Sequence, residues 1–166
     1  MPTTNTVNNG KIQYDDALTP VRIRADSSNR LALPRNIVDH MSWLSGSEIV
    51  HAWLLVLSLG RYRLLTDDEV KSNPDLEPVR DLVLRGQVIG RGDLITAEEP
   101  KRAAMAAKLL PTIVTPPGPT WRIVLPKAIA IFIPADCDAK DFILFLTLDG
   151  FWELWNTHIL HEVTEL

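Results

Sequence analysis

The sequence predicts a mainly β fold with short helices, built from two similar halves and a helical region that connects them. The first observation is a repeated stretch, Asp26–Arg35 and Gly118–Lys127. In each copy an Arg is followed by three apolar residues ending in Leu, then by Pro and a basic residue. The second observation is a pair of almost continuously apolar segments, Ile49–Leu59 and Phe142–Leu148, each followed by a Gly turn. Segments of this length bounded by turn residues are typical of buried strands.

The spacing of the two copies indicates an internal duplication. Pro34 and Pro126 are 92 positions apart (126 − 34), and Gly60 and Gly150 are 90 apart (150 − 60). The second copy has therefore lost two residues between these landmarks, a drift small enough to favour a true repeat over a chance match. Each half is expected to run strand, Pro-started helix, turn, buried strand, Gly turn and strand.

Composition and charge limit the classes of function. The chain has 166 residues, of which 46% are hydrophobic and 23% charged, enough for one domain or two small ones with a real core. No apolar stretch is long enough to cross a membrane, Met1–Gly10 does not read as a secretory signal, and the single Cys137 cannot form an internal disulfide. We therefore expect a cytoplasmic protein. The net charge of −4 counts against a generic nucleic-acid binder unless basic residues cluster locally.

Short-range patterns predict the elements of the first half. Val21–Arg24 alternates apolar and basic residues, as a half-exposed strand does, and Asp26–Asn29 is a turn cluster. Arg30–Leu33 is then a second short strand, and Pro34 fits the first turn of a helix. Ile49–Leu59 is the buried strand of this half.

The connecting region is predicted to be helical. Thr66 can cap a helix that begins with acidic residues. A second helix is expected over Ala97–Leu110, stopped by Pro111, and followed by a stiff linker at Pro116–Pro119. The resulting division of the chain is a flexible tail at 1–20, a first half at 21–66, a connecting region at 67–119 and a second half at 120–166.

These elements resemble the swapped-hairpin β-barrel of the AbrB/SpoVT superfamily, and their doubling in one chain resembles its MraZ-like members. Asp26 and Arg30 have the spacing of the Asp-x-x-x-Arg loop of that superfamily, and Leu33-Pro34 follows as the helix start. Glu153-Leu154-Trp155 matches the Glu-aliphatic-Trp signature of its final strand. The resemblance covers roughly 21–65 and 120–161.

The resemblance implies a non-enzymatic, cytoplasmic transcription regulator. Its two halves interleave into one pseudo-symmetric barrel, the barrels assemble into homo-oligomers, and the Asp-x-x-x-Arg loops face DNA. No cofactor, metal or membrane partner is implied. The residues expected at the DNA face are Arg24, Asp26, Arg30, Arg35, Trp121, Arg122 and Lys127.

Departures from the family pattern leave a second interpretation open. Ser28 and Asn29 occupy the positions of a usual Lys and Gly, Gly118 replaces the acid of the second loop, and Trp121 replaces a Gly. The alternative is an oligomeric interaction or scaffold protein on the same fold that has lost DNA binding. In that case Asp26 merely fixes the strand–helix corner.

Other residues give weaker signals. The two-faced apolar strands need cover from the connecting helices or from another subunit, and four of the five tryptophans are expected to pack in the core or an interface. Trp121 could either rest on a sugar or base or plug the end of the barrel. His158 and His161 could share a helix face, but no third metal ligand is evident. No nucleophile–base arrangement is recognisable, so an enzyme is not expected.

Overall fold

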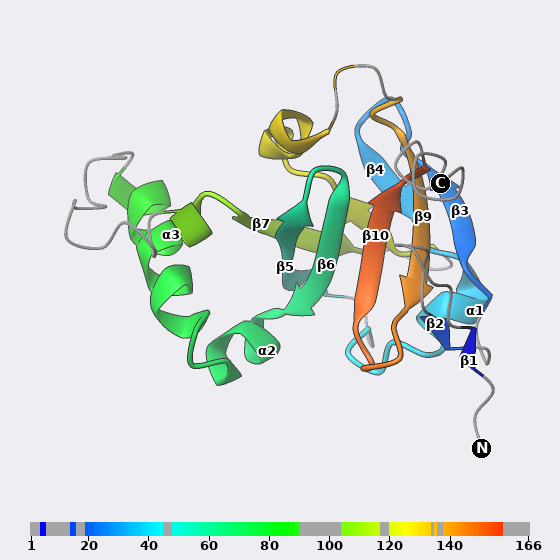
Figure 1. Cartoon of the computed structure of the whole chain (residues 1–166), viewed down its shortest axis with the longest axis horizontal. Helices are drawn as coiled ribbons and strands as arrows, with labels where there is room; N and C mark the ends of the chain where they lie inside the picture. The colour runs from blue at the N-terminus through cyan, green and yellow to red at the C-terminus, as the bar shows by residue number, and fades with distance from the viewer. Residues whose placement is uncertain are drawn as a thin grey trace.

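Eight antiparallel strands form a nearly closed, barrel-shaped sheet, and two helices project from one side of it (Figure 1). The computed structural model describes residues 4–5, 14–15, 19–44, 48–89, 104–116, 120–133, 135 and 138–157. Cys137, His158 and His161, named in the sequence analysis, lie outside these ranges.

The helices and strands follow one another in two comparable series. Their bounds are β1 (Thr4–Asn5), β2 (Tyr14–Asp15), β3 (Val21–Arg24), β4 (Arg30–Ala32), α1 (Arg35–Val38), β5 (Val50–Ser58), β6 (Arg61–Thr66), α2 (Asp67–Ser72), α3 (Glu77–Ile89), β7 (Leu109–Thr115), β8 (Arg122–Val124), the 3-10 helix η2 (Lys127–Phe132), β9 (Asp141–Leu146) and β10 (Trp152–Asn156).

Strands from the two parts of the chain interleave in the sheet. The order is β3-β9-β10-β6-β5-β7-β8-β4, and β3 and β4, at its two edges, lie against each other. Strands β3–β6 therefore meet strands β7–β10 at four seams, namely β3–β9, β10–β6, β5–β7 and β8–β4. Because β3 lies beside β4, the order can be read as a circle. Exchanging β3 with β7, β4 with β8, β5 with β9 and β6 with β10 leaves this circular order unchanged.

The registers at two of these seams repeat the spacing of the sequence motifs. The β4–β8 ladder is centred on Leu31 opposite Ile123, 92 positions apart (123 − 31). The β6–β10 ladder runs symmetrically about Arg63 opposite Glu153, 90 positions apart. These separations equal those of the two prolines and the two turn glycines, so each ladder is centred on two residues at matching positions relative to these sequence landmarks.

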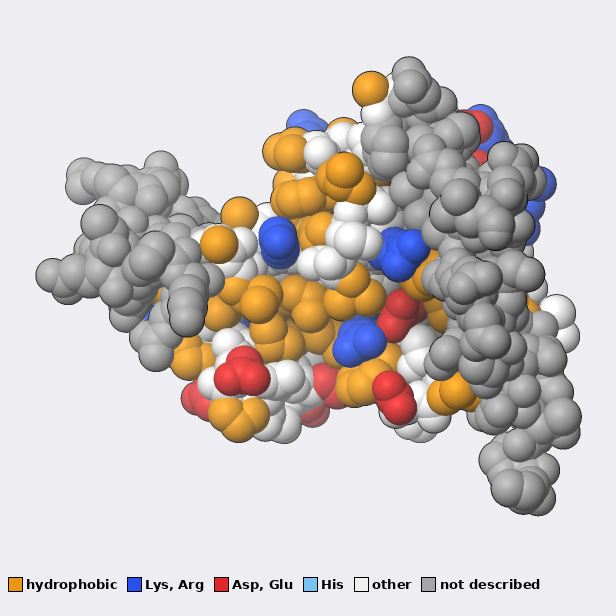
Figure 2. Space-filling view, viewed as in Figure 1, with side chains coloured by type: hydrophobic (Ala, Val, Ile, Leu, Met, Phe, Trp, Pro, Cys, Tyr) orange, Lys and Arg blue, Asp and Glu red, His pale blue; other side chains and the backbone are white. Residues whose placement is uncertain are grey.

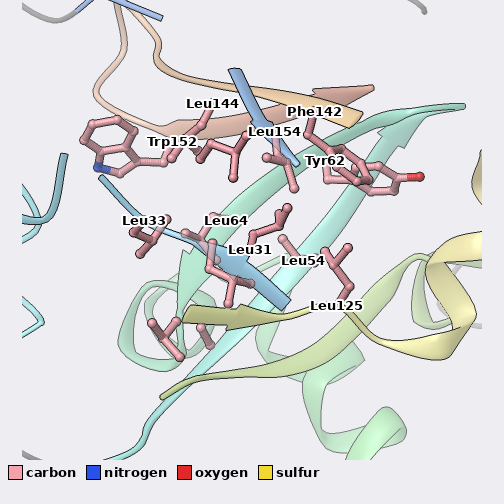
Figure 3. Packing of buried hydrophobic residues seen from close by; sticks show 14 of the residues in the cluster. Leu31, Leu33, Leu54, Tyr62, Leu64, Leu125, Phe142, Leu144, Trp152 and Leu154 are labelled. Carbon is pink, nitrogen blue, oxygen red and sulfur yellow. The ribbon is translucent and has the colours of Figure 1, made fainter. Parts of the chain in front are cut away.

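Apolar side chains from both series fill the barrel interior (Figure 3). Leu31 and Ile123 are 0% exposed, and Tyr62 packs edge-to-face on Phe142 with ring centroids 6.4 Å apart. Strand alternation explains this core, because every second residue of each strand points inward. The sequence-based expectation of core packing for four tryptophans is confirmed for Trp53, Trp152 and Trp155, which are buried, and Trp43 is partly buried against the core.

A second, smaller core covers the outer face of β5. Trp53 and Leu109 point out of the barrel and pack with Val70 of α2 and Val79 of α3. This confirms the expectation that connecting helices cover part of a two-faced strand. Leu57 and Leu59, farther along the hairpin, remain exposed, and Figure 2 shows hydrophobic side chains gathered across the middle of this face.

One prediction about the connecting region is wrong. Leu109 and Leu110, expected to end a helix, begin strand β7, and Pro111 lies within that strand. Pro111 is tolerated because β8 pairs with β7 only at Val114 and Thr115, so β7 has a single partner at the proline. The connecting region also contains a 13-residue helix, α3, whose bounds were not predicted.

The expected tail contains two short strands, β1 and β2, which pair antiparallel.

Among the described residues, no helix is both long and apolar enough to span a bilayer.

Candidate nucleic-acid interface

The β4–β8 ladder places the two repeated arginines on one outer face. Leu31 and Ile123 point into the core, so their neighbours in each strand point outward. Arg30 lies opposite Val124 and Arg122 lies opposite Ala32. Arg30 and Arg122 are thus diagonal neighbours across the seam. In the usual geometry of such pairs, their Cα atoms are about 7–8 Å apart. The structure therefore brings together two cations that are far apart in the chain.

The loop before Arg30 is held by Asp26. Its Oδ1 accepts hydrogen bonds from the backbone N–H groups of Ser28 (2.9 Å) and Arg30 (3.0 Å), and its Oδ2 accepts one from Arg30 Nε at 3.1 Å. The Arg30 backbone N–H is the main reason that the pKa of Asp26 lies below its usual range, helped by Ser28 and the guanidinium. Asp26 thus fixes the turn between β3 and β4.

Each loop is also tied to the corner of the other copy. The backbone N–H of Leu125 donates to the Asn29 carbonyl, and that of Leu33 donates to the Trp121 carbonyl, both at 2.8 Å. Asn29 and Trp121 are 92 positions apart, like the prolines. The two corners therefore support each other across the seam.

The Trp121 side chain lies in the barrel core and is 7% exposed. Its ring packs among apolar residues of both copies, as the sequence-based alternative of a barrel plug requires. Its neighbour Arg122, by contrast, is partly exposed.

Strand β3 adds two further arginines to this side of the barrel. Arg24, expected from the sequence, donates to Asp138 at 2.6 Å. Arg22, which sequence reasoning did not select, forms a two-point pair with Asp141 through Nε (2.9 Å) and Nη2. The alternating pattern of Val21–Arg24 could have pointed to Arg22, because residues two apart in a strand share a face and Arg22 therefore lies on the same face as Arg24.

Carboxylates from the segment before β9 and at its start partly neutralise these arginines. The guanidinium of Arg24 is the main cause that lowers the pKa of Asp138, and the guanidinium of Arg22 does the same for Asp141. Both acids are therefore charged at neutral pH. Arg22 and Arg24 remain largely exposed, so a ligand can still reach them.

Two basic residues follow the repeated prolines. Pro34 (φ −61°, ψ 145°) and Pro126 (φ −63°, ψ 146°) precede α1 and η2 with nearly the same backbone geometry. Arg35 and Lys127 come next and are exposed. Within the described part of the chain, Arg35, Arg122 and Lys127 make no ion pair, whereas Arg22, Arg24 and Arg30 each make one.

We call this surface the basic face. It consists of Arg22, Arg24, Arg30 and Arg122 on β3, β4 and β8, with the carboxylates of Asp26, Asp138 and Asp141. Arg35 and Lys127 lie beyond opposite ends of the antiparallel β4–β8 ladder. Chemically, the basic face offers guanidinium donors to anionic oxygens. In the residues that the structure describes, no three His, Cys, Asp or Glu side chains converge as a metal site would require.

Comparison with known proteins does not assign the chain to a family. No family model, no curated protein and no solved structure matches it.

Proposed function

We propose that the protein is a DNA-binding transcription regulator of the MraZ/AbrB type, acting without enzymatic chemistry in the cytoplasm as a homo-oligomer. The observation that carries this proposal is the position of Arg30 and Arg122, which come from the two copies of the repeat and share one outer face across the β4–β8 seam. A binding surface made from both copies is what the family resemblance implies.

The architecture that goes with this function is a tandem swapped-hairpin barrel. Support comes from the shared separations of the registers: Leu31 with Ile123 at 92 positions, and Arg63 with Glu153 at 90. On this proposal β7 corresponds to β3, because β7 pairs with β5 as β3 pairs with β9. The second half then begins at Leu109 rather than at residue 120.

The chemistry of the basic face suits phosphate oxygens. Arginine donates in a planar fork that matches phosphate, and each neutralised phosphate releases counterions, which supplies affinity at low salt. Local clustering offsets the net charge of −4, and an oligomer presenting several such faces to one duplex gains affinity by multivalency.

A binding titration tests this function. Fluorescence anisotropy would follow binding of the full chain to a labelled duplex spanning the region upstream of its own coding sequence, at low salt. We expect the Arg30→Ala/Arg122→Ala double variant to bind at least about 100-fold more weakly, because each charge-assisted hydrogen bond contributes about 1.5–3 kcal/mol.

Arg85→Ala is the matched control for this titration. Arg85 is an exposed arginine on α3, away from the basic face. Its removal lowers the net charge by one, as each of the two substitutions in the double variant does, so the affinity of this control should stay close to that of the unaltered protein. Undetectable binding by both the unaltered protein and the double variant would overturn the proposal.

A specific observation favours a second candidate, an oligomeric scaffold on the same fold that no longer binds DNA. Three of the four cations on the basic face are already paired with Asp26, Asp138 and Asp141. Exposed pairs of this kind are weak, about 0–1 kcal/mol, so phosphate can compete with them. The scaffold predicts an oligomer by light scattering together with no DNA affinity at any salt concentration.

A further inference from the structure

The outer face of the β6–β10 ladder carries unlike side chains from the two halves. The guanidinium of Arg61 lies 4.2 Å from the ring centroid of Trp155, and that of Arg63 lies 4.4 Å from the ring of Phe151. Arg63 Nη2 also donates to Glu153 Oε2 at 2.9 Å. The cations all come from β6, and their partners all come from β10 or the residue before it.

The Arg63–Glu153 pair is largely removed from solvent. The exposed fraction of its side chains is 27% for Arg63 and 8% for Glu153. The second carboxylate oxygen, Oε1, accepts a hydrogen bond from Trp155 Nε1 at 3.0 Å, so both oxygens of Glu153 are engaged. Removing one partner of such a pair leaves an uncompensated buried charge, which is strongly destabilising.

The symmetric register would also allow two like halves to pair. Tyr62 lies opposite Leu154 and Leu64 opposite Trp152, so the ladder is symmetric about Arg63 and Glu153. A β6 strand from a second copy of the chain could occupy the place of β10 in the same register. Arg63 would then face a second Arg63.

The two symmetric ladders differ in whether they would tolerate pairing of a strand with the same strand of a second chain. At the centre of β4–β8, Leu31 faces Ile123, and a pair of leucines or isoleucines there would still be buried and apolar. At the centre of β6–β10, two arginines or two glutamates would face each other, and like charges directly opposite each other destabilise a sheet. Selectivity between like and unlike halves therefore resides at Arg63 and Glu153.

We propose that the Arg63–Glu153 pair is a specificity lock for assembly with a second copy of this chain. It lets each half pair only with the opposite half, from the same chain or from another, and it rejects pairing of like halves. A dimer formed through the sheet then consists of exchanged halves and keeps two Arg63–Glu153 pairs. This lock follows from the strand registers and does not depend on DNA binding.

Charge reversal in the full chain tests the lock. Arg63→Glu places two glutamates at the centre of the ladder, and Glu153→Arg places two arginines there. Each variant alone should lose about 10 °C of Tm, while the Arg63→Glu/Glu153→Arg double variant should recover most of that loss.

The decisive step mixes the two single variants. Equimolar Arg63→Glu and Glu153→Arg chains, one of them labelled with ¹⁵N, are unfolded together and refolded. Exchange of halves restores an opposite-charge pair in both barrels, so native mass spectrometry should show a mixed dimer and the Tm should return to within a few degrees of the unaltered protein. This readout works even when each single variant alone fails to fold.

Lys71→Glu is the matched control, because Lys71 pairs with Asp67 within the same helix, α2. It reverses one charge but should neither lower Tm substantially nor form a mixed dimer with Glu153→Arg. A double variant as unstable as the single variants would overturn the proposal, and so would a refolded mixture without the mixed dimer.

Discussion

At the scale of single residues, the turn between β3 and β4 depends on two side chains with different roles. The Asp26 carboxylate accepts hydrogen bonds from backbone N–H groups of the loop, whereas Asn29 supplies a left-handed backbone conformation, with φ 57°. Asn adopts this conformation more readily than most residues. Because the Asn29 carbonyl also receives the Leu125 N–H, this conformation holds the corner of the other copy in place.

A β-branched residue at position 29 should therefore weaken the whole barrel. We expect Asn29→Val to lower the free energy of unfolding by about 1–2 kcal/mol, because Val is strained in the left-handed region. Asn29→Gly, which removes the strain, should stay close to the unaltered protein. Urea unfolding followed by tryptophan fluorescence measures both, and equal stability of the Val and Gly variants would show that the loop adopts another conformation.

At the scale of elements, Asp67 joins α2 to both α3 and the barrel. It is the first residue of α2, next to a capping box formed by Thr66 and Glu69. Its carboxylate accepts hydrogen bonds from Arg80 (2.7 and 3.1 Å) and from Trp53 Nε1 (2.9 Å). The Arg80 bonds are the main cause that holds the pKa of Asp67 well below its usual range, with Trp53 and Lys71 contributing.

This lowered pKa makes a pH-dependent prediction. A carboxylate whose pKa is depressed in the folded state stabilises the fold above its unfolded pKa of about 3.9, and that contribution is lost as pH falls through the folded value. Asp67→Asn should therefore cost about 2 kcal/mol of unfolding free energy at pH 7, and progressively less below pH of about 4. Urea titrations across pH measure the difference.

Asp68→Asn serves as the control for the effect of charge on α2. Asp68 is exposed, so its replacement should have a small effect at every pH. A cost of Asp67→Asn that does not change with pH would show that the carboxylate charge is not what holds the helices.

Elements with local signals were predictable, and those set by distant contacts were not. The corners at Pro34 and Pro126 and the capped start of α2 depend on neighbouring residues, and the structure has them where the sequence placed them. Strand β7 was missed because Leu109 and Pro111 also fit the end of a helix. Only pairing with β5, across more than fifty residues of chain, decides between the two.

At the scale of the whole molecule, the candidate site was predictable where the repeat marks it. Arg30 and Arg122 stand out because they recur. The pairing of Arg22 with Asp141, and of Arg63 with Glu153, joins residues about a hundred positions apart, so no local pattern indicates it. The crossing of the two copies at Leu31 and Ile123 turns two separate motifs into one surface.

The salt dependence of DNA binding tests most directly whether both copies form this surface. For each neutralised phosphate, the slope of log affinity against log salt changes by about 0.9. Arg30→Ala and Arg122→Ala should each reduce the magnitude of this negative slope by about 1, and the double variant should reduce it by about 2. A slope unchanged in both single variants, or lowered in only one of them, would contradict a DNA-binding face shared by the two copies.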